Sequence, residues 1–556
     1  MTRPGRNMRA LVAAALFFIV VCAAHETRAS KLAEGQRRAA GGGVAAERAE
    51  QEVAEGVAAI ERGDEEAARA AFRRALAADA ENVTAHTYLG VLADRAGDLK
   101  EAERHFAAAA MAAPFLAPAR NNYGAILLRA GRTQLAAAQF EASLKLDRNQ
   151  PSALVNLAQI RFKGGKPEDL RAARELFARA DRIAPDAEIA RALVVIALRL
   201  GEREAAANAY RDYAARLSSA AASSPISAPA SRGELGTALL EGRLFDEAVR
   251  ELGAAAEAEP SNVGFVVALA RAHLGRRDIP SAGRTLEAAV ARGLDTAPVY
   301  AALADVYEAG GYVENAIPAM RLALARDPKN ESYHYRYGML LTDTKAPAAA
   351  TIRLQEALQE FPRSPRLWLA LGVAQFVNGK NEDATRSLNR ALELAPEFVP
   401  ALAYLGAVHA ERGQYATAVS FFERAIAADD KLAAPFYLAA DSLLKQPEVD
   451  TARVEKYLAR SVELDPNFPQ ARLALAKLYV RAERWTEAAS QLENAVRLDP
   501  NLAEAHYQLG RVYARLRRTT EAQATMATFK KLSDAQREQK DNERRVLVRR
   551  LANVNF

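Results

Sequence analysis

A repeat of 34 residues runs through most of this 556-residue chain and limits what it can fold into. Segments 88–114, 123–147, 303–328 and 405–429 align with one another in a single register. Position 20 of the repeat is its clearest mark, because alanine fills it in nearly every unit. The residues at this position are Ala68, Ala102, Ala136, Ala173, Ala207, Ala248, Ala282, Ala316, Ala350, Ala384, Ala418, Val454, Ala488 and Ala522.

These marks define about fourteen consecutive units. Repeats of this length are single supersecondary units that cannot bury their apolar face alone, so neighbouring units must stack. Most units follow each other at the full period, and three steps in the chain are longer. The units begin near residues 49, 83, 117, 151, 188, 229, 263, 297, 331, 365, 399, 433, 469 and 503.

The remaining marks of each unit resemble the tetratricopeptide repeat family. That resemblance implies an all-α fold, a right-handed α-solenoid of about fourteen helix-turn-helix hairpins. Composition agrees, since half of the residues are hydrophobic but only 7% are aromatic, and alanine is abundant. Small residues at positions 8 and 20 would let the two helices approach closely. The second unit carries the pattern as His86, Leu89, Gly90, Ala93, Ala102, Phe106, Ala109 and Pro114.

The amino terminus has the pattern of a secretory signal. Three arginines precede an apolar run over residues 10–24, which is short for a membrane span. We expect a signal peptide over residues 1–29, cleaved after Ala24 or Ala29, and export to the periplasm or the medium. An uncleaved anchor is one alternative. A lipid anchor at Cys22 is another, although Val21 stands where a lipobox needs a small residue.

Composition then divides the rest of the chain. Residues 30–48 read as a low-complexity spacer, 49–216 as an N-terminal array of about five repeats, and 229–536 as a C-terminal array of about nine. The Ser-, Ala- and Pro-rich stretch 217–228 between them is either a hinge or a local loop in one continuous solenoid. A capping-box pattern at Ser533 predicts a terminal helix, and residues 537–556 are expected to form a capping helix and tail.

Catalytic and metal-binding patterns are not found in the sequence. The histidines fall mainly at repeat positions where packed aromatic residues are expected, and no pair of them has the spacing of metal ligands. There is no phosphate-binding glycine loop and no nucleophile elbow. The net charge of +6 is small for this length and does not indicate a nucleic-acid partner. We therefore expect a protein that is not an enzyme, with no cofactor and no small-molecule substrate.

The family resemblance implies that the first helix of each hairpin lines a concave binding surface, and two patches stand out there. In the first patch, Arg95, Arg129 and Lys163 recur at position 13, with Asn122 and Asn156 at position 6. The asparagines resemble two rungs of a ladder that holds a peptide backbone. A cation near the end of a helix also has an explanation without a ligand, since the helix dipole favours it there.

The second patch consists of Lys477, Arg481, Arg511 and Arg515, at positions 9 and 13 of the last two units. The two residues of each helix are four apart and therefore share one helical face. An acidic partner segment would suit this patch, because arginine binds carboxylates through two parallel hydrogen bonds.

The sequence thus predicts an exported scaffold that binds a protein or peptide segment in its groove, within an envelope-associated assembly. Membrane contact would come only through an uncleaved anchor or the basic tail. The alternatives are an assembly factor for exported polysaccharide and a non-catalytic subunit of an enzyme complex.

Overall fold

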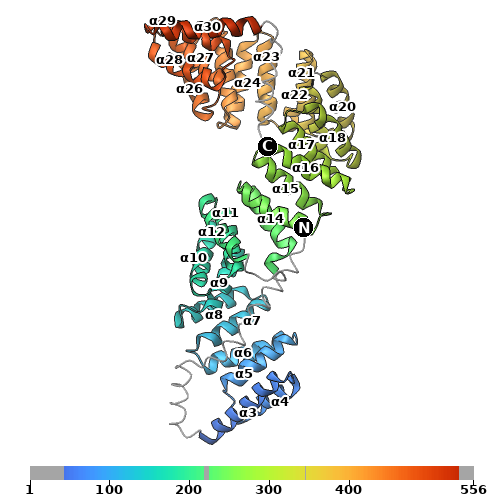
Figure 1. Cartoon of the computed structure of the whole chain (residues 1–556), viewed down its shortest axis with the longest axis vertical. Coiled ribbons are helices and arrows are strands. Elements are labelled where there is room, and N and C mark those ends of the chain that lie inside the picture. The colour runs from blue at the N-terminus through green and yellow to red at the C-terminus, as the bar shows by residue number, and fades with distance from the viewer. Residues whose placement is uncertain (1–42, 218–224, 345, 537–556) are drawn as a thin grey trace. The chain divides into compact units, whose positions relative to one another are not determined.

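The computed structural model describes residues 43–217, 225–344 and 346–536. This part of the chain contains helices and no strand, which confirms the expected all-α repeat fold. Successive helices form antiparallel hairpins that follow one another along the chain (Figure 1). The predicted signal segment and the tail 537–556 lie outside the described residues.

Two compact units can be distinguished, one ending at Ala289 and the other beginning at Val290, within a single helix. The described residues of the first unit form seven hairpins. Its helices are α3 (Gly43–Glu61), α4 (Glu65–Ala78), α5 (Val83–Arg95), α6 (Leu99–Ala112), α7 (Ala117–Arg129), α8 (Thr133–Leu146), α9 (Pro151–Gly164), α10 (Pro167–Ile183), α11 (Ala187–Arg199), α12 (Arg203–Leu217), the short η1 (Pro225–Ser227), α13 (Pro229–Glu241), α14 (Phe245–Ala258), α15 (Val263–Gly275) and α16 (Ile279–Ala291).

The second unit continues with the same hairpin. Its helices are α17 (Ala297–Ala309), α18 (Val313–Arg326), α19 (Glu331–Asp343), α20 (Pro347–Glu360), α21 (Pro365–Val377), α22 (Asn381–Leu394), α23 (Val399–Glu411), α24 (Tyr415–Ala428), α25 (Ala433–Leu444), α26 (Thr451–Leu464), α27 (Pro469–Arg481), α28 (Trp485–Leu498), α29 (Ala503–Arg515) and α30 (Thr519–Gln536).

Close helix approach inside most hairpins depends on the small residues at positions 8 and 20. A Cβ atom on Gly124 would lie 2.7 Å from the ring of Phe140, and one on Gly406 would lie 2.5 Å from the ring of Phe422. The residue predicted at position 20 is buried in all of the described hairpins except the fifth. The repeat marks therefore describe the contact between the paired helices, as the sequence predicted.

The fifth hairpin corrects the sequence register by one residue. Its first helix begins at Ala187, so the buried residues at positions 8 and 20 are Val194 and Ala206. The predicted residues, Val195 and Ala207, are only partly buried. The predicted start of the fifth unit was wrong by one residue because the preceding unit is longer than 34 residues. The sequence does not show where the extra residues of that unit lie.

Two predicted boundaries also differ from the structure. α3 begins at Gly43, inside the predicted spacer, because an Ala- and Glu-rich stretch favours helix and Ala49 is fully buried. At the other end, α30 continues to Gln536 without a break at Ser533, so that serine does not cap a new helix.

The helices on either side of residues 218–224 contribute to one hydrophobic cluster. Tyr210 and Tyr213 on α12 share this cluster with Leu235 and Leu239 on α13 and Leu252 on α14. Repeats on both sides of residues 218–224 therefore bury side chains in a common core.

Candidate partner-binding surfaces

The first basic patch is largely paired within the protein. Arg129 forms an ion pair with Asp94, whose side chain is only 3% exposed, and Arg95 lies 3.7 Å from Glu65. Lys163 is exposed and has no ion-pair partner among the described residues. The structure thus leaves one of the three predicted cations available to a partner.

A third asparagine connects the two that the sequence singled out. Asn156 on α9 donates to Oδ1 of Asn121 at 3.3 Å, and Asn121 donates to Oδ1 of its neighbour Asn122 at 3.5 Å. Asn121 and Asn122 are both buried. Asn121 lies one repeat position before Asn122, so the recurrence of asparagine at position 6 does not indicate it, although the adjacent pair is visible in the sequence.

In the second basic patch, one of the four cations pairs with a carboxylate of the described residues and three do not. Lys477 on α27 lies 2.6 Å from the Glu504 carboxylate on α29. Arg481, Arg511 and Arg515 are exposed, and no acidic side chain in the described part of the chain pairs with them. The guanidinium of Arg511 stands over the ring of Tyr507 at 5.6 Å, and that of Arg515 over Trp485 at 5.7 Å. Aromatic faces orient these arginines without neutralising them.

Two histidines come together in the second hairpin, contrary to the expectation from their spacing. The Nδ1 atoms of His86 on α5 and His105 on α6 are 3.0 Å apart. Burial is the main cause that lowers the pKa of His105 to about 4, with His86 and Arg104 adding to it. His105 is therefore uncharged near neutral pH. The sequence could not indicate this pair, because helix packing brings residues 19 apart into contact.

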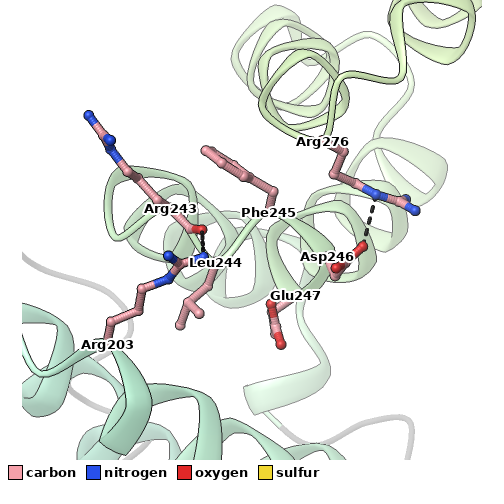
Figure 2. Close-up of a pocket in the computed structure, with 7 residues that line it drawn as sticks. All are labelled: Arg203, Arg243, Leu244, Phe245, Asp246, Glu247 and Arg276. Atoms are coloured by element: carbon pink, nitrogen blue, oxygen red, sulfur yellow. Dashed lines mark hydrogen bonds and ion pairs between the residues drawn. The ribbon is translucent and has the colours of Figure 1, made fainter. Parts of the chain in front are cut away.

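A cavity of about 460 Å³ opens beside the turn between α13 and α14. Figure 2 shows two contacts among the residues that line it: Arg203 donates to the backbone carbonyl of Arg243 at 3.0 Å, and Arg276 pairs with Asp246 at 2.8 Å. The guanidinium of Arg243 points away from both contacts. The lining thus combines basic and acidic groups and offers no catalytic constellation.

Two further features bear on function. Within the described ranges, no group of three or more His, Cys, Asp or Glu residues could hold a metal ion. In those same ranges, no helix has both the length and the apolar character needed to cross a membrane.

Comparison with known families identifies the repeat. Models described as "TPR repeat" and "Tetratricopeptide repeat" match in succession along the chain. The chain belongs to the tetratricopeptide repeat family. Repeat scaffolds of this family are typical of protein–protein interaction, and the fold is typically non-catalytic. The matched residues are 53–117, 124–188, 238–306, 297–330, 347–396, 369–433, 479–516 and 503–536.

The curated relatives of this tetratricopeptide repeat protein are similar over part of their length. It is 33% identical to BBSome complex member BBS4 of Mus musculus over 133 residues, covering 24% of this chain and 25% of the relative. It is 25% identical to BBS4 of Bos taurus over 269 residues, covering 47% and 49% respectively. The chain thus spans at most about half the length of these relatives.

Solved structures of similar fold include two long repeat proteins. Yeast Tom70 matches with a TM-score of 0.42 and 15% identity, over 85% of this chain and 99% of that chain. The Cut9 assembly, described as the APC/C hetero-tetramer Cut9-Hcn1, matches with a TM-score of 0.38 and 15% identity, over 84% and 97%.

Proposed function

We propose that this protein is an exported, non-catalytic scaffold that binds an acidic segment of a partner protein through α27 and α29. A role within a multi-protein assembly of the cell envelope fits this proposal. The curated relatives are named as members of a complex, which supports a role as one subunit among several.

The observation that carries the proposal is a set of three exposed arginines that have no carboxylate partner among the described residues. Arg511 and Arg515 are four residues apart on α29 and share one face of that helix. Arg481 is the last residue of α27, which packs against α29. Guanidinium groups recognise carboxylates through two parallel hydrogen bonds, so an acidic segment would match their geometry as well as their charge.

A double charge reversal tests the arginine patch. We expect Arg481→Glu with Arg515→Glu to weaken binding of a fluorescein-labelled oligo-glutamate peptide by roughly tenfold or more, since two favourable ion contacts become repulsive. Fluorescence anisotropy measures the affinity for the peptide. The affinity of the wild-type protein should fall as the salt concentration rises. Circular dichroism should show unchanged helical content.

The matched control reverses two exposed arginines on second helices, Arg321→Glu on α18 and Arg424→Glu on α24. Its charge change is identical, so it separates a local contact from the effect of net charge. Equal loss of binding in both double variants, or no loss in the first, would refute the proposal that the arginine patch binds the acidic segment. Affinity purification from envelope fractions with the same variants would then test the natural partner.

Export rests on the predicted signal over residues 1–29 and is part of the proposal. Cell fractionation and the mass of the mature amino terminus test it. Cleavage after Ala24 or Ala29 with the protein in the periplasm or medium supports export, whereas a full-length cytosolic protein contradicts it.

A further inference from the structure

The turn between the second and third hairpins carries two large apolar side chains that the described residues leave uncovered. Met111 near the end of α6 is 81% exposed, and Phe115 in the following turn is 84% exposed. Exposed apolar area of this kind adds almost nothing to the hydrophobic core, so the fold does not account for it.

The repeat gives no reason for a phenylalanine at this place. Phe115 occupies position 33, directly after the proline at position 32. In every other unit that is followed at the 34-residue period, position 33 is polar or charged, and its residues are Glu81, Asn149, Ser261, Asp295, Lys329, Arg363, Glu397, Lys431 and Asn501. An aromatic residue here is therefore not required by the hairpin, which indicates a contact outside the chain.

The backbone holds Phe115 at the tip of a fixed turn. The N–H of Leu116 donates to the carbonyl of Ala113 at 3.1 Å, which closes the turn. Arg120 on α7 donates to the carbonyl of Pro114 inside the turn at 3.3 Å. Because the turn is already ordered, a contact through the exposed ring costs little further ordering of the chain.

The next two turns between hairpins add two more apolar side chains. Leu146 is the last residue of α8 and Ile183 is the last residue of α10, and both are exposed. They lie ten residues after Ala136 and Ala173, the alanines at position 20, so they occupy equivalent places in their hairpins.

Hydrogen bonds between neighbouring turns place these residues along one edge of the first unit. Ser143 in the last turn of α8 donates to the carbonyl of Ala117, which follows the turn of Phe115, at 2.8 Å. Arg179 in the last turn of α10 donates to the carbonyl of Arg148, in the turn that follows α8, at 2.6 Å. The ends of α6, α8 and α10 therefore adjoin one another.

Cations lie beside the apolar side chains of this edge. Lys145, Arg148 and Arg182 are exposed, and no acidic side chain in the described part of the chain pairs with them. Over residues 111–120, 145–150 and 179–186, five residues are basic and three are acidic, so the edge has a net positive charge.

The three acidic residues make contacts within the protein. Asp147 accepts a hydrogen bond from the N–H of Asn149 at 2.9 Å, and the side chain of Asp186 caps the start of α11. Asp181 forms an ion pair with Arg216. The exposed cations at this edge thus remain available to an external anion.

We propose that this edge, defined by Met111, Phe115, Leu146 and Ile183, docks on the surface of an anionic lipid bilayer. Apolar side chains at the tips of turns can enter the boundary between headgroups and acyl chains, while the adjacent cations bind lipid phosphates. Contacts spread over three turns, with cations among them, fit a broad surface of repeated phosphates better than one short peptide segment.

Tryptophan fluorescence tests the contact at its centre. Phe115→Trp keeps an apolar ring, and its added emission should move to shorter wavelength when the full chain is mixed with vesicles of phosphatidylcholine and phosphatidylglycerol. Vesicles of phosphatidylcholine alone should cause a smaller shift, because they do not attract the cations. The matched control is Ile352→Trp, at an exposed apolar site on α20, which should show no shift.

Co-flotation with the same vesicles measures the affinity. We expect Met111→Ser with Phe115→Ser to weaken binding to the anionic vesicles by roughly tenfold or more. Arg148→Gln with Arg182→Gln should remove the preference for anionic over neutral vesicles. The apolar run over residues 10–24 is present in every variant, so a difference between variants reports on the edge.

An emission of the Phe115→Trp chain that does not respond to anionic vesicles would overturn the proposal and would favour a protein contact at this edge. An equal loss of binding in the control Tyr312→Ser with Ile352→Ser, two exposed apolar residues of the second unit, would also overturn it. Oligo-glutamate binding should be unchanged in Met111→Ser with Phe115→Ser, so this proposal and that of the arginine patch are tested separately.

Discussion

At the scale of single residues, the turn between the two helices of a hairpin requires a backbone conformation with positive φ, which is unfavourable for most residues. Glycine with positive φ fills this turn in most hairpins, as Gly97 does at 82°. In four of the hairpin turns that the structure describes, a larger residue adopts the same left-handed conformation, which costs a residue other than glycine about 1–2 kcal/mol. These residues are Arg243, Arg277, Glu483 and Arg517.

Replacing one of these residues by glycine should therefore stabilise the fold. We expect Arg277→Gly to raise the free energy of unfolding by about 0.5–1 kcal/mol, because the relief of strain exceeds the added entropy of the unfolded chain. Urea denaturation measures the change. The reverse substitution, Gly97→Ala, should lower the midpoint, and a lower midpoint for Arg277→Gly would contradict the argument.

At the scale of helices, a buried polar network links three elements beside the interruption of the repeat. Glu251 on α14 is 1% exposed, accepts a hydrogen bond from Tyr210 on α12 at 2.7 Å and pairs with Arg232 on α13 at 2.8 Å. Burial, followed by the charge of Glu251, raises the pKa of Tyr210, which keeps its hydroxyl as a donor. The network fixes how α13 and α14 pack on α12.

Removing the shared acceptor should loosen this junction. We expect Glu251→Leu to destabilise the protein by roughly 3 kcal/mol, because it leaves the partly buried Arg232 without its carboxylate. Hydrogen exchange should accelerate first in α13 and α14. Glu257→Leu, at an exposed site on the same helix, is the control and should change little; an equal effect of both substitutions would refute the network's role.

At the scale of the whole molecule, stability comes from side chains that adjoining hairpins share. Leu473 on α27, Leu492 on α28 and Leu509 on α29 belong to one buried cluster. Each hairpin thus covers the apolar face of its neighbour, and stability is approximately a sum of local and nearest-neighbour terms.

A truncated chain that ends at Asp499 tests this additivity. Without α29 and α30, Leu473 and Leu492 lose part of their cover, so hydrogen exchange should accelerate in α27 and α28. Protection in α5 to α8 should stay unchanged, because the effect fades beyond the adjoining repeats. Loss of protection throughout the chain would show that folding is cooperative over the entire array.

The sequence by itself determined the period, the hairpin and the residues that hold its helices together. Ala316, Gly406 and Phe422 lie where the repeat predicts, because contacts inside one hairpin depend on fixed spacings along the chain. Where the spacing changes, as before Ala187, that rule no longer fixes the register.

Tertiary structure alone decided which of the predicted binding residues remain available. Arg129 and Asp94 pair across two hairpins, as do Lys477 and Glu504, while Arg481 remains exposed. Packing likewise joined His86 to His105 and Asn121 to Asn156. These contacts join separate helices. Their distances depend on how the helices pack and on which side-chain rotamers fit between them, and a periodic sequence pattern encodes neither.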